Sequence, residues 1–414
     1  MVNNINPMLL SILFLPFVGA FLIKLLPPRH AIRAGFIILL LQMACFPPVV
    51  RDLVGGKVWQ ANIYGVFADL LGVCFRCNLI SLIFAFTSVF IGFFIYLFST
   101  GYFIGEKEEL QQTFAFWGLV FVGSMMGVVF SDNLISLYVF WQLAALCSWR
   151  LIGLCRTEQH LLKADKAFLI TTFGAGLMMV SFACIYLQTG SFSLSYIRQS
   201  SVSPIVFTLF FLGVITASAS FPFHTWLIDA SVAPAPVMAF LNAAVFVNIG
   251  IYTLLRVFGL TLSVKGWVAW AGWLALLSSF IAGIVALRQD DINKLLACST
   301  VSQLGLMIAG LLMFNAVAIR GVLIFYVAHA LGAGSLFLCA GIAEKVFGTR
   351  DIKQMGGLMK DMPVVTYGFL IGMFSIIGIP PLPGSFGKME IITGMLVERQ
   401  VLFAFFAMLT TVLT

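Results

Sequence analysis

Charged residues are scarce in this chain of 414 residues: they make up 9% of it, whereas hydrophobic residues make up 61%. A soluble globular domain has roughly 25% charged residues, so this chain has too few to cover a water-facing surface of its size. The composition therefore excludes a soluble protein. It indicates a polytopic membrane protein whose surface is covered by the lipid bilayer.

Motifs for cofactors and nucleic acids are absent as well. No run of Lys/Arg and no basic stripe interleaved with aromatic residues is present, which argues against a nucleic-acid partner. The sequence has no phosphate-binding loop, no H-E-x-x-H and no dinucleotide fingerprint. Most of the eight cysteines lie in apolar runs, and the exception is CFRC at 74–77. A single C-x-x-C lacks half of the ligands that a structural metal site needs, so we expect no cofactor and no metal in this chain.

Apolar runs follow one another along the whole chain. A membrane-spanning helix needs about 20 apolar residues. Candidate runs lie at 8–26, 34–50, 78–99, 113–130, 133–154, 167–187, 203–221, 235–258, 268–287, 295–314, 317–343, 363–379, 385–397 and 400–414. We interpret 363–379 and 385–397 as two halves of one broken helix. This predicts an all-α polytopic membrane protein with about thirteen transmembrane helices, no soluble domain, and loops at 51–76 and 344–362.

The chain ends and the basic residues predict an orientation. No basic residue precedes the first apolar run, so we expect a retained span and not a signal peptide. The last run stops at Thr414 without a polar tail, so we expect either a truncated chain or an end inside the bilayer. The side reached after the first span carries fourteen Lys/Arg residues and the opposite side eight. Because basic residues concentrate in cytoplasmic loops, this predicts a cell-membrane protein with its N-terminus outside.

Ionisable side chains inside or next to the apolar runs are the candidate functional residues. A charge at bilayer depth is costly, so such groups tend to line ion paths or to face the interior of a bundle. The candidates for an ion pathway are His224, Asp229, His329, Lys388 and Glu390.

Two segments rich in proline and glycine interrupt apolar runs at bilayer depth. They lie near 221–236, which contains Pro222, and near 378–388. Freed backbone groups are tolerated in a membrane only where they line a protein-filled or wet cavity. A pair of interrupted helices in corresponding parts of the chain is typical of transporters that are built from inverted repeats.

Four segments resemble a known family: FPFHTWLIDASVAPAPVMAFLNAA, ALRQDDINKLLACSTVSQLGLM, HALGAGSLFLCAGI and GIPPLPGSFGKMEII. They are similar to the antiporter-like membrane subunits of respiratory complex I, of multisubunit sodium/proton antiporters and of membrane-bound hydrogenases. The most specific match is DINKLLACSTVSQLG at 291–305. The resemblance implies two inverted five-helix repeats, each with a discontinuous helix, and a row of charged residues that passes protons or sodium ions.

The resemblance also implies a division of the chain and a set of departures. We expect N-terminal helices at 1–112, a first repeat at 113–258 and an incomplete second repeat at 259–414. Positions where the family carries an ionisable residue are neutral here, namely Gln142, Ala217, Asn242, Asn248 and Ala333. Asparagine and glutamine can hydrogen-bond but do not exchange a proton near neutral pH. The sequence therefore predicts that the first half-channel no longer titrates.

Each remaining ionisable residue has a structural alternative. His224 could cap backbone carbonyls at the helix break, and Asp229 could cap the N-terminus of the next helix. Lys388 could pair with Glu390 or with another protein of the complex. The basic cluster Arg150, Arg156, Lys163 and Lys166 is expected to be a solvated rim. For His329 and Lys388 we favour a role in the ion path.

Three functional hypotheses follow from the resemblance. The first is a membrane subunit of a redox-driven ion-translocating complex, similar to complex I or a hydrogenase, that transports protons or sodium with a degenerate first half-channel. The second is a non-pumping structural or coupling subunit of such a complex. The third is a membrane partner in inorganic-carbon uptake. In the first two hypotheses the partners are other membrane subunits, the lipid bilayer and, indirectly, soluble redox subunits, and this chain has no catalytic centre of its own.

Overall fold

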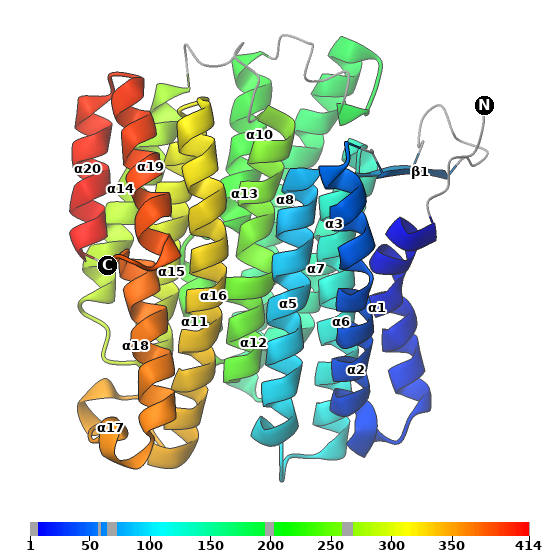
Figure 1. Ribbon diagram of the computed structural model, residues 1–414, viewed down its shortest axis with the longest axis vertical. Coiled ribbons are helices and arrows are strands. Elements are labelled where there is room, and N and C mark those ends of the chain that lie inside the picture. Colours follow the sequence, from blue (N-terminus) through cyan, green and yellow to red (C-terminus); the bar gives the residue numbers. More distant parts are fainter. Residues whose placement is uncertain (1–6, 57–58, 64–72, 195–202, 259–267, 414) are drawn as a thin grey trace.

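The computed structural model describes residues 7–56, 59–63, 73–194, 203–258 and 268–413. These form a bundle of long helices that run roughly side by side (Figure 1). A backbone in lipid must satisfy its own N–H and C=O groups, and a helix does so within one segment. The predicted all-α membrane fold is therefore confirmed.

The described residues of the N-terminal part form four α-helices, the short 3-10 turn η1 (Pro28–His30) and two paired strands. The helices are α1 (Pro7–Leu25), α2 (Ala31–Ala44), α3 (Phe46–Val54) and α5 (Leu79–Tyr102). Strands β1 (Trp59–Ile63) and β2 (Val73–Cys77) pair antiparallel, with Trp59 opposite Cys77. The prediction of a loop over 51–76 is thus wrong, because α3 extends to Val54 and the strands follow. Aromatic and β-branched residues such as Trp59 and Val73 favour this extended pairing.

The middle of the chain supplies the first group of central helices. They are α6 (Glu108–Phe130), α7 (Leu134–Ile152), α8 (Glu158–Thr189), α10 (Pro204–Ala217), α11 (Thr225–Asp229), α12 (Ala235–Ala239) and α13 (Phe246–Phe258). A short π-helical turn, η3 (Phe240–Ala244), joins α12 to α13. Side-chain caps begin two of these helices: Asn133 accepts from the N–H of Ile135, and Thr157 from that of His160. Both are residue types that favour an N-cap position.

The C-terminal part supplies the second group. It comprises α14 (Ala269–Ala286), α15 (Ile292–Leu311), α16 (Ala316–Phe347), α17 (Leu358–Asp361), α18 (Pro363–Ile377), α19 (Pro383–Val397) and α20 (Val401–Leu413). The prediction of a loop over 344–362 is wrong at its start, because α16 continues to Phe347. It is also wrong further on, where the 3-10 turn η5 (Ile352–Gln354) and α17 are found.

Ten helices in the described ranges are long and apolar enough to cross a membrane. Three shorter apolar helices accompany them, Pro204–Ala217, Pro363–Ile377 and Val401–Leu413. The predicted count of thirteen is not confirmed by this measure. The three predicted spans that are missing from the ten are the two interrupted helices and the last helix. Each of their helical pieces is shorter than the length that a span needs.

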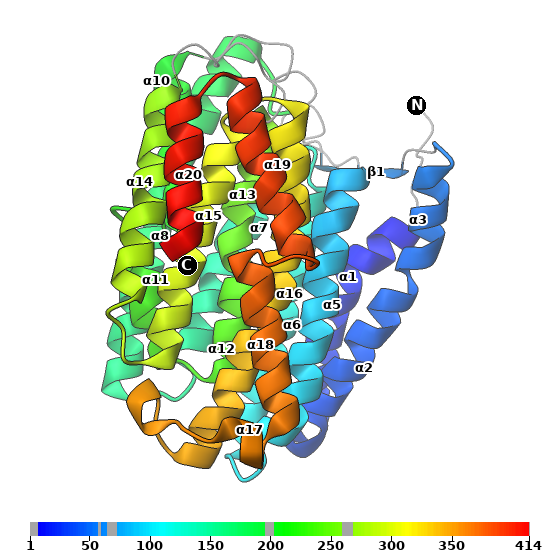
Figure 2. The same ribbon diagram turned by 60° about the vertical axis from the view of Figure 1, so that its left-hand side comes forward.

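Both predicted helix breaks are confirmed. Helix α10 ends at Ala217 before α11 begins at Thr225, and α18 ends at Ile377 before α19 begins at Pro383. Figure 2 shows α19 continuing above α18 as the second half of one interrupted element. Gly378 closes α18 with φ +92°, a backbone conformation that favours glycine. The domain boundaries drawn from the sequence stay a prediction.

The segment α12–η3–α13 lies at the centre of the bundle. Its apolar stretch within Ala235–Phe258 is fully buried, and α6 and α15 beside it are mostly buried. We call the end of the bundle that carries β1 and β2 the hairpin end. The opposite end carries α17 and the turn between α5 and α6 (Figure 1), and we call it the basic end.

Candidate functional site

Two asparagines lie at the centre of the buried helix pair η3–α13. Asn242 and Asn248 are both 0% exposed. The Nδ2 of Asn242 donates to the carbonyl of Met238 at 2.9 Å, and that of Asn248 to the carbonyl of Ala243 at 2.9 Å. The amide oxygen of each is buried without a protein partner among the described residues. Such oxygens in a closed interior are acceptors for water, so this site is polar and neutral.

The second half contains an ionisable site. Lys388 is 3% exposed, and its ammonium donates to the carbonyl of Ile377 at 3.2 Å, at the C-terminal end of α18. The same ammonium lies 5.1 Å from the ring centroid of Phe325. The ring centroid of His329 is 6.2 Å from that of Phe325. Helices α16 and α19 thus hold Lys388 and His329 around one aromatic ring.

His329 has an unusual environment. It is 0% exposed, and within the described ranges neither ring nitrogen has a hydrogen-bond partner. Buried polar groups are nearly always hydrogen-bonded, and an imidazole can both accept and donate a proton. His329 is therefore suited to exchange a proton with water or with a neighbouring group. This agrees with the role favoured for it from the sequence, which stays a prediction.

The two helix breaks differ in the donor that closes the first half-helix. At the second break the donor is the ammonium of Lys388. At the first break the indole N–H of Trp226 donates to the carbonyl of Thr216 at 2.8 Å, next to the end of α10. Ala217, where the resemblance implies a lysine in the family, is buried and directly follows Thr216 in the chain. An indole donates permanently and does not titrate, so of these two donors it is Lys388 that can lose its charge.

Glu390 does not belong to this buried site. Its carboxylate accepts from the Nε of Arg320 at 2.7 Å, and the Arg320 side chain is 65% exposed. The alternative in which Lys388 pairs with Glu390 is therefore wrong. Residues two positions apart on a helix point in different directions, which explains why Glu390 faces outward while Lys388 faces inward.

Asp229 forms an ion-pair cluster at the basic end. Its two carboxylate oxygens accept from Lys163 at 2.8 Å and from Lys166 at 2.6 Å. Partial burial raises the pKa of Asp229, but the hydrogen bonds from both lysines outweigh this and hold it below its usual range. Asp229 caps no helix with its side chain, so the capping alternative is wrong. Lys163 and Lys166 stay 32% and 40% exposed, so they remain at the rim and also pair with Asp229.

His224 lies at the turn before α11 and is half-buried. It occupies the N-cap position of α11 without a side-chain cap, and its Nδ1 is buried without a partner among the described residues. Burial lowers the pKa of His224 from its usual value. Its ring stacks beside that of Phe221 at 5.7 Å between centroids. The structure thus places His224 at the first break, away from Lys388.

The segment 225–232 is held from both halves of the chain. From α8, the Nε2 of His160 donates to the carbonyl of Val232 at 3.0 Å. From the loop after α16, Arg350 donates to the carbonyl of Ser231 at 2.7 Å and to Glu344 at 2.7 Å. Together with the lysines on Asp229, these contacts immobilise the segment after the first break. This fits a structural role better than a mobile one.

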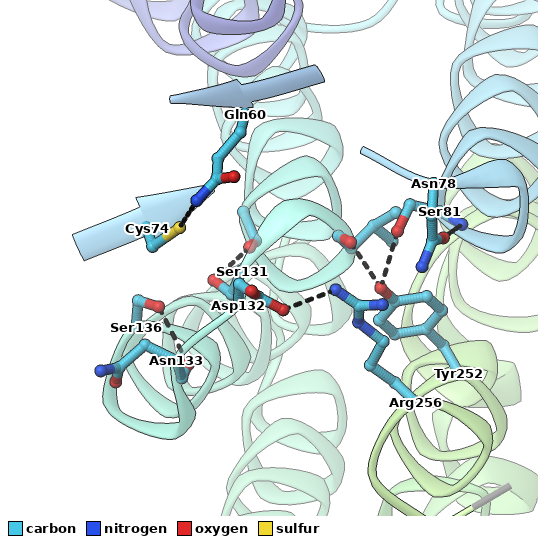
Figure 3. Close-up of polar contacts among 12 residues, drawn as sticks. Gln60, Cys74, Asn78, Ser81, Ser131, Asp132, Asn133, Ser136, Tyr252 and Arg256 are labelled. Carbon is cyan, nitrogen blue, oxygen red and sulfur yellow. Dashed lines mark hydrogen bonds and ion pairs between the residues drawn. The ribbon is translucent and has the colours of Figure 1, made fainter. Parts of the chain in front are cut away.

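A buried ion pair lies at the hairpin end. The guanidinium of Arg256 donates to Asp132 at 2.8 Å, and the two side chains are 2% and 11% exposed (Figure 3). One turn away on α13, the hydroxyl of Tyr252 contacts Ser81 and donates to the carbonyl of Val129. Neither Arg256 nor Asp132 was predicted from the sequence as a site residue. The four-residue spacing of Asn248, Tyr252 and Arg256 was the available signal for a polar helix face.

The remaining neutral positions lie inside the bundle. Gln142 on α7 is half-buried, and its amide oxygen has no protein partner in the described part of the chain. Ala333 on α16 is 2% exposed. Neither supplies a titrating group. Among the described residues, the arrangement therefore comprises a buried ionisable site around Lys388 and His329, a buried ion pair between Arg256 and Asp132, and neutral polar residues at Gln142, Asn242 and Asn248.

Comparisons with known proteins place the chain in a family. The family model described as NADH:quinone oxidoreductase/Mrp antiporter, transmembrane, matches residues 131–414. The A subunit of the Na(+)/H(+) antiporter of Alkalihalophilus pseudofirmus is 36% identical over 435 residues, covering 95% of this chain and 51% of the relative. The A1 subunit of the Staphylococcus aureus Na(+)/H(+) antiporter is 35% identical over 319 residues, covering 72% of this chain and 40% of the relative. This chain thus spans about half the length of the curated relatives that it matches.

Two solved structures share the fold. A chain of the Mrp complex from Dietzia sp. superposes with a TM-score of 0.88 at 20% identity, covering 97% of this chain and 77% of that chain. A chain of the membrane-bound sulfane sulfur reductase, an archaeal respiratory membrane complex, superposes with a TM-score of 0.88 at 21% identity. It covers 99% of this chain and 86% of that chain. At these identities the likeness establishes the fold alone.

Proposed function

Since the chain belongs to the NADH:quinone oxidoreductase/Mrp antiporter transmembrane family, we propose that it is a membrane subunit of a multisubunit complex that translocates ions. The transported ions are protons, exchanged for or accompanied by sodium. The names of the curated relatives favour an exchange of sodium for protons, in which the gradient of one ion drives the movement of the other. Redox chemistry in soluble partner subunits is the second candidate for the driving force.

The burial of Lys388 carries this proposal. A buried ammonium is costly unless opposite charge or several hydrogen bonds compensate it. Lys388 has one carbonyl and one aromatic face, and no carboxylate pairs with it among the described residues. The arrival of water or of a cation therefore changes the balance between its charged and neutral forms. That response is what coupling of proton movement to a second event requires.

The first half acts as a neutral support in this proposal. Its break is closed by Trp226, its central polar residues are asparagines, and a carboxylate at each end is paired, namely Asp229 with two lysines and Asp132 with Arg256. The ion pairs of Asp229 at the basic end and the buried pair of Asp132 at the hairpin end hold the helices of this half together at both ends. These same contacts favour the alternative function, a coupling role without a through path, if Lys388 proves inert.

We also propose that the N-terminus and the hairpin end face outward and that the basic end faces the cytoplasm of a multi-pass cell-membrane protein. The excess of Lys/Arg on one side of the sequence supports this orientation.

The test is transport by inverted vesicles from cells that make the whole complex with Lys388→Met. Methionine keeps the length of the side chain and removes the charge. We expect at least a tenfold loss of sodium-induced release of a proton gradient, read with a pH-sensitive dye. Lys360→Met is the matched control, because Lys360 is exposed at the basic end and the same charge is lost. Unchanged transport in an assembled Lys388→Met complex would refute the ion-translocating role and leave the coupling role as the function.

A further inference from the structure

A pair of adjoining pockets opens at the basic end, away from Lys388. One has a volume of about 180 Å³ and the other about 400 Å³, and they share Thr113, Leu154 and Arg156. The walls come from the start of α6, the end of α7 with the turn after it, and the start of α8. Neither pocket contacts the helix breaks, so the mechanism proposed above does not use them.

Three cationic side chains line these pockets, namely Lys107, Arg150 and Arg156, against one carboxylate, Glu109. Within the described ranges none of the three cations forms an ion pair. The sequence predicts a solvated rim for Arg150 and Arg156, and in the structure both line one pocket of this rim. A concentration of unpaired positive charge in a concave site favours an anionic ligand.

Arg150 is held in a defined position. Its guanidinium lies 5.7 Å from the ring centroid of Trp117 and 5.5 Å from that of Trp149. The indole N–H of Trp149 donates to Asp165 at 2.7 Å, which fixes the ring. A guanidinium that stacks on aromatic faces keeps its N–H donors free for a planar or tetrahedral anion.

The other walls are apolar. Leu110, Leu154, Leu161 and Trp149 line the pockets. On α8, next to the pocket residue Leu161, Leu162 is 61% exposed and Leu169 is 68% exposed, and their spacing of seven residues puts both on one face of the helix. Cationic groups at helix ends, tryptophans at the same level and an apolar track toward the bilayer centre match the three zones of a phospholipid.

We propose that these pockets bind the phosphate headgroup of an anionic phospholipid. Arg150, Arg156 and Lys107 contact the negatively charged phosphodiester, and the acyl chains follow the apolar face of α8. The free phosphate ion shares the phosphate chemistry but lacks the acyl chains that the apolar walls accommodate. The site is independent of the function proposed for Lys388.

The experiment measures lipid binding to the purified chain in detergent by native mass spectrometry. Phosphatidylglycerol and phosphatidylcholine with identical acyl chains are compared, and we expect at least tenfold tighter binding of the anionic lipid. The double variant Arg150→Gln/Arg156→Asn should lose about 30-fold in affinity for phosphatidylglycerol, since each interfacial cation contributes about a factor of five. Asparagine is chosen because Arg156 has φ +54°, which asparagine tolerates.

The matched control is Arg288→Gln/Lys360→Gln, which removes two exposed cations from the same end. It should retain the preference for phosphatidylglycerol. Equal binding of both lipids by the wild-type chain, or full binding by the Arg150/Arg156 variant, would overturn the proposal. Competition by millimolar inorganic phosphate at constant ionic strength would instead assign the site to a soluble anion. If the double variant does not fold, Arg156→Asn alone supplies the same test with an expected loss of about fivefold.

Discussion

Replacing Arg256 with methionine should strongly destabilise the folded chain. The substitution keeps most of the side-chain volume but leaves the carboxylate of Asp132, which is 11% exposed, without the guanidinium 2.8 Å away. Removing one partner of a buried pair costs about 3–5 kcal/mol, because the remaining charge stays desolvated. We expect a value near the lower limit, about 3 kcal/mol, since Asp132 keeps some access to the surface at the hairpin end.

The double variant Arg256→Met/Asp132→Leu provides the decisive comparison. Two apolar residues of similar size can replace a buried ion pair at little cost, so the double variant should be more stable than Arg256→Met alone. The measurement is reversible unfolding in mixed detergent micelles, followed by tryptophan fluorescence, for the wild type, both single variants and the double variant. The four free energies of unfolding yield the coupling between the two side chains.

The pair Arg320–Glu390 is the matched control for this experiment. Its N–O distance of 2.7 Å is nearly the same, but the Arg320 side chain is 65% exposed. Breaking an exposed pair has little effect on stability, so Arg320→Gln should unfold like the wild type. If Arg256→Met also unfolds like the wild type, burial of the Asp132–Arg256 pair contributes nothing and the reasoning is wrong.

Three further predictions concern stability and transport. Asp229→Asn should lower the free energy of unfolding by about 1 kcal/mol at pH 7. Because the folded-state pKa of Asp229 is low, the stabilisation is complete above the usual aspartate pKa and is lost as the pH falls through the lower value. The difference between variant and wild type should therefore shrink in unfolding curves recorded at successively lower pH below the usual aspartate pKa. In vesicles with confirmed assembly, Gln142→Leu/Asn242→Leu should leave the sodium-to-proton stoichiometry unchanged, and a lower proton count would show that the first half conducts. Glu390→Gln should likewise retain the transport that Lys388→Met abolishes, and equal losses in both variants would contradict their separation in the structure.

The apolar runs predicted the helices well because burial in lipid leaves the backbone few alternatives. Helix α13, for example, occupies the predicted range up to Phe258. Both breaks were also predictable, because Pro222 and Pro381 cannot donate to a continuous helix. The hairpin of β1 and β2 was not predicted, since its pairing joins residues separated by an intervening segment and has no helical period.

Partners of individual charges could not be predicted from spacing along the chain. Lys163 and Lys166 meet Asp229 from a helix more than sixty residues away in the sequence. Asp132 and Arg256 are separated by 124 residues. Only the packing of α8 against α11, and of the α6–α7 turn against α13, brings these groups together. The local pattern indicated that such residues need a partner, but it did not identify which one.

The two helix breaks make this chain a paired comparison within a single molecule. Both breaks experience the same temperature and the same lipid or detergent. They differ in the group that donates to a carbonyl at the end of the first half-helix, which is the indole of Trp226 at one break and the ammonium of Lys388 at the other. A spectroscopic probe on each carbonyl, Thr216 and Ile377, would therefore separate two kinds of response in one sample. A shift with pH at both carbonyls reports on the surroundings, whereas a shift at Ile377 alone reports on the charge of Lys388.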